Sequence, residues 1–189
     1  AAEKVYEGIG ESALIDINIK LKNANLYWLP KELILFNKSK LKRRININLD
    51  NNSNFIFCET SILGRKAMSE KIQNIFFSDI WKVTKNSKLK HVEAININGK
   101  TNKILNNRFT FDNHSSFSTI LMFGEIFERI QNDIRKIIEN IKDIFCEISI
   151  WDKKTVIRSI ANDNYDLKKT LNYILKNTIN DKIPKNWYL

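Results

Sequence analysis

The chain has 189 residues, 43% of them hydrophobic, and a formal net charge of +10. This length and apolar content suit one domain with a well-buried core, and no apolar run reaches the ~18 residues that a membrane-spanning helix needs. The positive charge is compatible with a nucleic-acid partner, but aromatic residues do not interleave with the scattered basic ones as base-stacking platforms would. We therefore predict a basic, solvated surface, and keep a basic nucleic-acid-binding β-rich protein as the alternative function.

The first two thirds of the chain predict β-strands. Residues 13–22 and 43–49 alternate apolar and polar side chains, which is the period of a strand with one wet face. Pro30 interrupts an apolar stretch and marks a break or an edge, because proline has no N–H to donate to a ladder. Residues 50–54 predict a turn, and residues 55–63 predict a strand buried on both faces. Further strands are predicted within 71–100, with turns at 85–87 and 98–99, at 108–112 and 116–123, and within 144–160, with a turn at 152–154.

Two segments predict helices instead. From Gly124 to about Lys142 the apolar residues recur every three or four positions, as on one face of an amphipathic helix. Residues 166–177 show a similar stripe, with Asn164 or Asp166 as the predicted cap. The sequence therefore predicts a mainly β domain spanning residues 1–189, with two α-helices toward the C-terminal end, at about 124–142 and 166–177.

Local motifs carry little chemistry. The sequence lacks the glycine-rich phosphate loops and the paired Cys or His motifs of common metal sites. Cys58 and Cys146 lie in apolar runs, which favours small buried hydrophobes in a reducing compartment over a disulfide. We interpret His91 as a surface or rim residue. The first residues lack the basic and apolar segments of a secretory signal, so we expect a cytoplasmic protein.

Three acids lie within apolar stretches, namely Glu59, Glu93 and Asp79. An acid in a strand normally points to water, whereas a buried one needs a cationic partner, for which Arg65 is the nearest candidate for Glu59. Two carboxylates could also serve a hydrolase as acid and base. That alternative requires Glu59 and Glu93 to lie within roughly 5–10 Å of each other around an open cleft.

Five blocks, in this order, resemble the urease accessory protein UreD (UreH) family: "AAEKVYEG", "YWLPKELILFNKSKLKRR", "CETSILGRKAMSEK", "FSDIWKV" and "IPKNWYL". The W-L-P and G-R-x-A-M blocks are distinctive, and the matches extend over essentially the whole chain. The sequence departs from the family pattern at Glu7, Lys31, Ser69 and Lys185-Asn186. It also lacks the family's N-terminal segment with its G-G-x-x-G-G-D motif, so strands that pair with that segment are expected to have open edges.

The resemblance implies a β-helix-like stack of strands with two helices, and a helper role rather than catalysis. It implies binding to UreF and the GTPase UreG, docking on apo-urease, UreE as nickel donor, and no tightly bound cofactor. Nickel would pass through the protein in transit. A passage for a hydrated dication needs carboxylates that bind it weakly.

Two glutamates, Glu59 and Glu93, match positions where family members carry interior acids, and Glu3 of the A-A-E block is a third candidate. The rival interpretation makes each a structural acid paired with a cation or backbone N–H groups. Gly64, Arg65, Pro30 and Trp28 are predicted to be structural, with Gly64 in a turn and Arg65 as an ion-pair or hydrogen-bond anchor.

Overall fold

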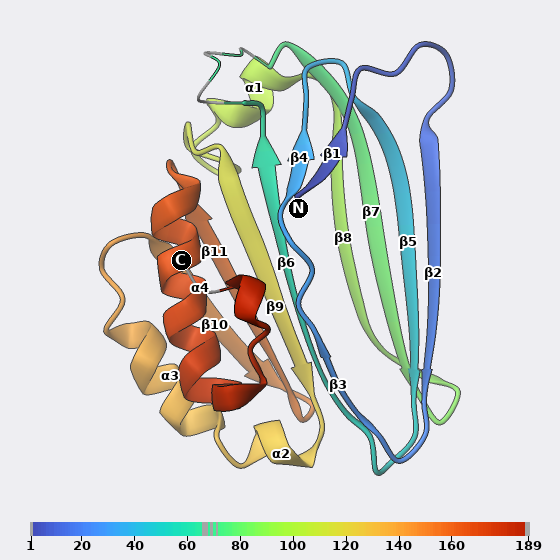
Figure 1. Ribbon diagram of the computed structural model, residues 1–189, viewed down its shortest axis with the longest axis vertical. Coiled ribbons are helices and arrows are strands. Elements are labelled where there is room, and N and C mark those ends of the chain that lie inside the picture. The colour runs from blue at the N-terminus through green and yellow to red at the C-terminus, as the bar shows by residue number, and fades with distance from the viewer. Residues whose placement is uncertain (1, 66–67, 69, 71, 188–189) are drawn as a thin grey trace.

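The computed structural model describes residues 2–65, 68, 70 and 72–187. Within this part the strands form two sheets that face each other, and helices cover the outer face of one of them (Figure 1). The strands are β1 (Glu3–Val5), β2 (Ala13–Leu21), β3 (Asn25–Trp28), β4 (Leu33–Leu35), β5 (Lys40–Leu49), β6 (Asn54–Leu63), β7 (Asn74–Lys85), β8 (Lys88–Lys100), β9 (Ser116–Phe123), β10 (Phe145–Trp151) and β11 (Lys154–Ala161). The helices are α1 (Thr101–Leu105), α2 (Glu125–Glu128), α3 (Gln131–Glu139), α4 (Asn164–Ile179) and two 3-10 turns, η2 (Asn180–Lys182) and η3 (Lys185–Trp187).

One sheet has four strands in the order β2-β5-β7-β8. Strands β2, β5 and β7 run parallel, and β8 returns antiparallel to β7. In β5 every second residue from Leu41 to Leu49 is buried and the residues between them are exposed, as a sheet with one solvated face requires. The strand predictions for residues 13–22 and 43–49 are therefore confirmed.

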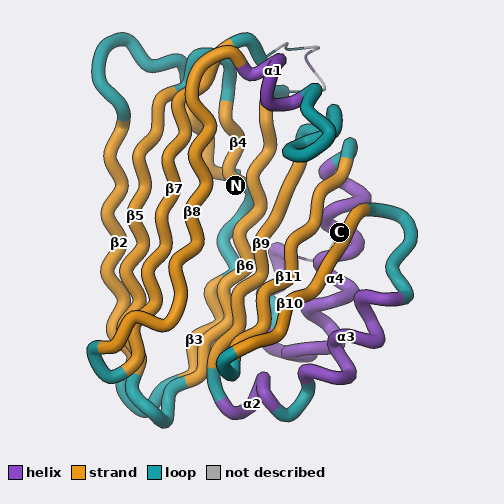
Figure 2. The backbone as a smooth tube through the Cα atoms, turned by 180° about the vertical axis from the view of Figure 1, so that it is seen from behind, coloured by secondary structure: helices purple, strands orange, loops and turns teal. Residues whose placement is uncertain are grey.

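The other sheet has the order β1-β4-β6-β9-β11-β10, with β3 also paired to β6. Its central strand β6 is buried along almost its whole length, which confirms the prediction for residues 55–63. One face of β6 carries Phe55 and Phe57 toward the four-stranded sheet, and the other carries Ile56 and Cys58 toward the helices. Figure 2 shows the resulting three layers from behind. The chain leaves the sheet between β3 and β4, at the break predicted from Pro30.

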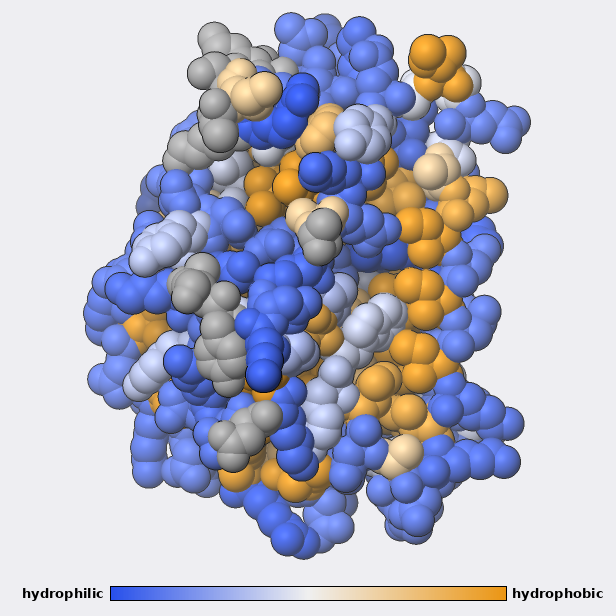
Figure 3. Space-filling model, in the orientation of Figure 1, coloured by the Kyte–Doolittle hydropathy of each residue, from blue (hydrophilic) through white to orange (hydrophobic). Residues whose placement is uncertain are grey.

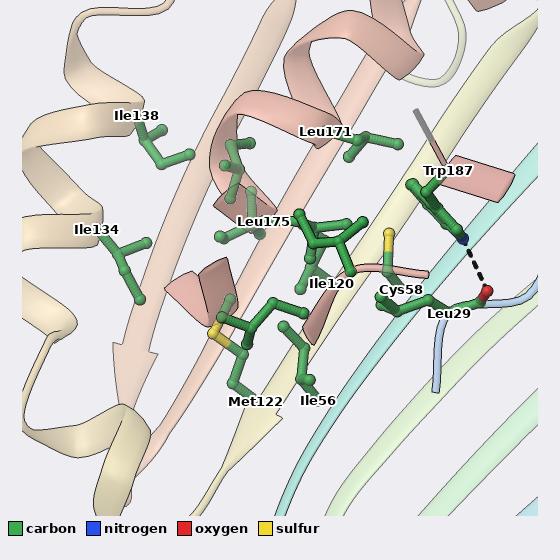
Figure 4. Packing of buried hydrophobic residues seen from close by; sticks show 14 of the residues in the cluster. Leu29, Ile56, Cys58, Ile120, Met122, Ile134, Ile138, Leu171, Leu175 and Trp187 are labelled. Atoms are coloured by element: carbon green, nitrogen blue, oxygen red, sulfur yellow. Dashed lines mark hydrogen bonds between the residues drawn. The ribbon is translucent and has the colours of Figure 1, made fainter. Parts of the chain in front are cut away.

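The helices close the apolar core on the outer face of this sheet. Ile134 and Ile138 of α3, which lies beside β10, and Leu171 and Leu175 of α4 belong to one buried cluster with side chains of β6 and β9 (Figure 4). The indole Nε1 of Trp187 donates a hydrogen bond of 2.8 Å to the backbone oxygen of Leu29, which fixes the C-terminal segment against the sheet.

The predicted helices exist, but their limits and caps differ from the expectation. The helix predicted for 124–142 is divided into α2 and α3, with Ile130 between them at φ −107° and ψ 6°. The helix predicted for 166–177 is α4, and its N-cap is Asp163 rather than Asn164 or Asp166. The Asp163 carboxylate accepts a hydrogen bond of 2.7 Å from the backbone N–H of Tyr165, so it satisfies a donor that the helix itself leaves free.

Two predictions were wrong, namely the strand at 108–112 and the turn at 98–99. Residues 108–112 form turns, because the side chain and backbone oxygens of Asn107 accept hydrogen bonds from the backbone N–H groups of Phe109, Thr110 and Asp112. Strand β8 continues to Lys100, through the predicted turn at 98–99. The turn at residues 85–87 is confirmed, with Asn86 and Ser87 between β7 and β8.

The mainly β fold class with two C-terminal helical regions is confirmed. Both sheets are open, so the β-helix-like stack implied by the resemblance is not confirmed. Both cysteines are free thiols, Cys58 buried and Cys146 partly buried. Among the helices of the described residues, none combines the length and apolar content needed to cross a bilayer.

Candidate functional site

A layer of polar side chains crosses the otherwise apolar space between the two sheets. On the seven-stranded sheet, register places Glu147, Arg158, Thr119 and Glu59 side by side on strands β10, β11, β9 and β6. The layer separates two apolar clusters, one around Phe57 and Trp81 and the other around Leu33 and Phe77. Because buried charges are costly unless they are paired, such a layer needs internal partners.

Arg43 is the central cation of this layer. It lies on β5 directly beside Asp79 of β7, and both side chains point toward Glu59 on the opposite sheet. Its Nε and Nη2 donate to the two oxygens of Asp79 over 3.0 and 2.7 Å, and its Nη1 donates to Glu59 Oε1 over 3.1 Å. The indole Nε1 of Trp81 adds a 2.8 Å hydrogen bond to Asp79. One arginine therefore ties two acids and both sheets together.

The second oxygen of Glu59, Oε2, is buried and has no hydrogen-bond partner among the described residues. Two carboxylates share one guanidinium, so the cluster has one negative charge in excess when both acids are ionised. Burial raises the pKa of Glu59 to about 7, with Arg43 opposing this rise and Asp79 adding to it. An unpaired carboxylate oxygen in a buried site is a position at which a proton, a water molecule or a cation is favoured.

A second cluster lies in the same layer, between β8 and β11. Arg158 Nη2 donates to Glu93 Oε2 over 2.6 Å, and its Nε donates to Oε1 over 3.3 Å. His91 Nε2 lies 3.3 Å from Glu93 Oε2, but this contact does not meet the geometry of a hydrogen bond. Burial opposes ionisation of Glu93, but His91 and Arg158 hold its pKa below the ordinary value. Arg158 is 54% exposed, so this cluster reaches solvent through its cation.

The structure places the predicted acids in different surroundings. Glu59 and Glu93 are only 5% and 6% exposed, and each has its own arginine. Glu3 is exposed on β1, on the face that is turned toward the four-stranded sheet, and its charge contributes to raising the pKa of Glu59. Because Glu59 and Glu93 are nearly sealed from solvent, the structure does not support a hydrolase that acts on them in an open cleft.

The partner expected for Glu59 was wrong. Arg65 pairs instead with Glu70, with Nε 3.1 Å from Oε2, and its guanidinium lies over the ring of Phe36. Gly64 has φ +81°, and a Cβ there would come within 2.9 Å of Ile72. Part of this segment, residues 66–67, 69 and 71, lies outside the described residues, including the family departure at Ser69. Within the described residues, this segment is the end of β6 followed by a turn at Gly64.

Trp28 and Pro30, the other two residues predicted to be structural, flank the polar layer. The indole of Trp28 stacks on Phe57 at 4.3 Å between ring centroids, at the end of β3. Pro30 lies in the break between β3 and β4. This break is next to the part of β6 that carries Glu59, because Trp28 pairs with Phe57 before it and Leu33 pairs with Ser61 after it.

Several residues of the layer were missed or misjudged from the sequence. The sequence does not single out Arg43 from the basic residues predicted to form a solvated surface, and it predicts His91 at the surface or rim, whereas both side chains are buried. The available signal was strand phase, because Arg43 alternates in step with Leu41, Ile45 and Ile47. In the described part of the chain, no three His, Cys, Asp or Glu side chains gather as ligands for a metal ion.

Comparison with known proteins gives a consistent result. The model of the family described as UreD urease accessory protein matches residues 1–184. The urease accessory protein UreD of Rhizobium leguminosarum bv. viciae is 30% identical over 191 aligned residues, which cover all of this chain and 69% of that protein. The protein of the same name from Agrobacterium fabrum is 32% identical, with 66% of its length covered.

Proposed function

The chain belongs to the UreD family of urease accessory proteins, and from this membership we propose that it assists nickel incorporation into urease. In this role it is a scaffold between apo-urease and the complex of UreF with the GTPase UreG, and UreE supplies nickel to that complex. The family match over residues 1–184 is the observation that carries the proposal. The protein has no catalytic part in the reaction and works in the cytoplasm.

The test of this role is omission. Urease and its accessory proteins are co-expressed with and without this chain, and urease activity and nickel content are measured. We expect both to fall to the background level when the chain is left out, as in a control that lacks UreF. Unchanged activity without the chain would reject the role.

We further propose that Glu59 and Glu93 line the route of the nickel ion, with Glu3 at its margin. The support is the polar layer itself, which carries buried carboxylates across the protein interior, together with the unpaired Oε2 of Glu59. Carboxylates already shared with arginines bind an incoming dication weakly, so the ion can leave again. The absence of a three-ligand cluster in the described residues is compatible with transit.

Glutamine substitutions test the route. In Glu59→Gln, Arg43 keeps both hydrogen bonds to Asp79, and in Glu93→Gln, the half-exposed Arg158 is reached by water. Both variants are therefore expected to fold and to assemble with the partners, while nickel content in urease falls several-fold. The measurement pairs pull-down of the partner complex with the nickel content of purified urease.

The matched control for this experiment is Glu125→Gln, which removes an exposed carboxylate outside the layer. It is expected to leave assembly and nickel content unchanged. Normal assembly with normal nickel content in both layer variants would contradict the route. Lost assembly would instead assign the two glutamates a structural role.

A further inference from the structure

A cavity of about 380 Å³ lies at one end of the molecule, between the β7–β8 and β10–β11 turns. Both turns are at the same end as α2 (Figures 1 and 2), and Figure 3 shows mainly hydrophilic side chains at this end, which is the lower one in that view. The charged residues that line the cavity are four lysines and two acids, namely Lys85, Lys88, Lys90, Lys153, Glu128 and Asp152. Two positive charges are therefore in excess, and the cavity attracts anions.

Lys154 is buried next to this cavity. It is 4% exposed and lies two residues before Val156, on the face of β11 that is turned toward the four-stranded sheet. Its Nζ donates a hydrogen bond of 2.6 Å to the backbone oxygen of Lys90 and lies 5.9 Å from the centre of the Phe123 ring. Both of these residues line the cavity. A lysine is rarely buried to this extent without a carboxylate partner.

Lys154 belongs to none of the ion pairs of the described residues. Asp152, the acid nearest to it in sequence, pairs with Lys90 over 3.4 Å. The ammonium of Lys154 instead contacts a carbonyl oxygen and the face of the Trp151 indole, whose centroid is 4.5 Å from Nζ. Burial lowers the pKa of Lys154, with Asp152 opposing this fall and Lys90 adding to it. A buried ammonium that is short of negative charge stabilises an anion placed beside it.

The type of cation indicates the type of anion. Every cation among the described lining residues is a lysine. An ammonium is a compact point charge that suits a phosphate, whose oxygens point in several directions, whereas the planar fork of arginine is the better match for a carboxylate. The volume of about 380 Å³ is within the range of sites for small ligands. Two linked phosphates fit this volume and the three excess positive charges that result when Lys154 is counted.

We propose that this cavity binds a small molecule through a diphosphate group, with Lys154 as the interior cation and Lys90 as the cation at the rim. Lys90 is suited to this position because its side chain is 35% exposed while its backbone oxygen holds Lys154. The bound anion supplies the negative charge that Lys154 lacks. The cavity has no lining residue in common with the Glu59 and Glu93 clusters, so this proposal does not depend on the role in nickel delivery.

The experiment is isothermal titration calorimetry of the purified chain with inorganic pyrophosphate, in a phosphate-free buffer of low ionic strength. The wild type is expected to bind pyrophosphate at one site. Lys154→Met and Lys90→Met each remove one charge-assisted contact, so each is expected to raise the dissociation constant at least about tenfold. Lys90→Met keeps the backbone oxygen that holds Lys154, and Lys154→Met puts an apolar side chain of similar size in a buried position. Melting curves check that both variants are folded.

Lys82→Met is the matched control, because Lys82 is exposed on β7 outside the cavity and its loss changes the net charge equally. We expect less than about a threefold change in the dissociation constant. Competition with ADP identifies the source of the diphosphate: displacement of pyrophosphate supports an organic diphosphate, and no displacement supports inorganic pyrophosphate. A wild type that does not bind pyrophosphate would overturn the proposal. Equal weakening by Lys82→Met would also overturn it, as would unchanged binding in folded Lys154→Met, which would leave Lys154 as a structural link between β11 and β8.

Discussion

Replacing Arg43 by Met is expected to lower the free energy of unfolding by about 3–5 kcal/mol at neutral pH. The side chain is 4% exposed and is the cation shared by Glu59 and Asp79, so its removal leaves two carboxylates buried without a counter-charge. Methionine fills a similar space, so the effect reports the lost charge rather than a cavity. Chemical denaturation with the linear extrapolation method measures it.

The matched control is Arg44→Met on the same strand. Arg44 is 69% exposed and lies 4.0 Å from Asp16, so its loss is expected to change stability by no more than about 0.5 kcal/mol. Adding Glu59→Gln to the Arg43→Met variant replaces an acid that must otherwise take up a proton or stay charged without a counter-charge, so it is expected to recover part of the stability. Equal unfolding curves for Arg43→Met and Arg44→Met would contradict the importance of the buried ion pairs.

The difference in stability between Arg43→Met and the wild type is expected to change with pH in one direction. The pKa of Glu59 in the folded chain, about 7, is above the ordinary value of 4.5, so the folded state binds a proton more tightly than the unfolded state does. The contribution of Glu59 to stability is therefore fully present below about pH 4.5 and is lost as pH rises through 7. Without Arg43 this pKa rises further, so the deficit of Arg43→Met relative to the wild type should shrink between pH 7 and 5. Glu93, whose pKa is lowered, contributes equally to both proteins and cancels in the difference.

Ile134→Asp is expected to destabilise the protein by at least about 3 kcal/mol, because it removes an apolar side chain from a packed core and puts an unpaired charge there. Ile134 is 1% exposed and packs between α3 and the seven-stranded sheet (Figure 4). Thermal melting followed by circular dichroism measures the effect.

Ile126→Asp provides the comparison for this substitution, since Ile126 lies on α2 and is 40% exposed. It is expected to cost less than about 1 kcal/mol. Similar melting temperatures for Ile134→Asp and the wild type would mean that α3 does not cover the sheet as described.

Periodicity predicted much of the fold because most of the long strands bury one face or both. The alternation in residues 43–49 and the apolar run at 55–63 correspond to β5 and β6. The division of the predicted helix 124–142 was beyond such reasoning, since the apolar stripe runs on across Ile130, where the backbone leaves the helical conformation. The order of the strands in each sheet could not be predicted from periodicity either, because parallel neighbours such as β2 and β5 are far apart in sequence.

The sequence predicted the acids of the candidate site but not the cations that pair with them. Glu59 and Glu93 stood out as acids within apolar stretches, but their cations did not. Arg43 lies between Lys42 and Arg44, which are both exposed, and only its phase relative to Ile45 distinguishes it. Arg158 carries no such signal, because apolar residues occupy both faces of β11 around it and its own side chain is exposed. Pairing across two sheets depends on the tertiary fold, so Arg65, which is closer in sequence, was the wrong partner for Glu59.

The parallel arrangement of β2, β5 and β7 also governs the order in which the protein assembles. Strands β7 and β8, like β10 and β11, are joined by two-residue turns with positive φ, at Asn86-Ser87 and Asp152-Lys153, and such local hairpins form within microseconds. Parallel neighbours have no such turn and must first close a long loop, which makes their pairing slow. Within the residues that the structure describes, β2 pairs with β5 alone and reaches it only through such a closure, so we expect it to be fixed late during folding and released early by local opening.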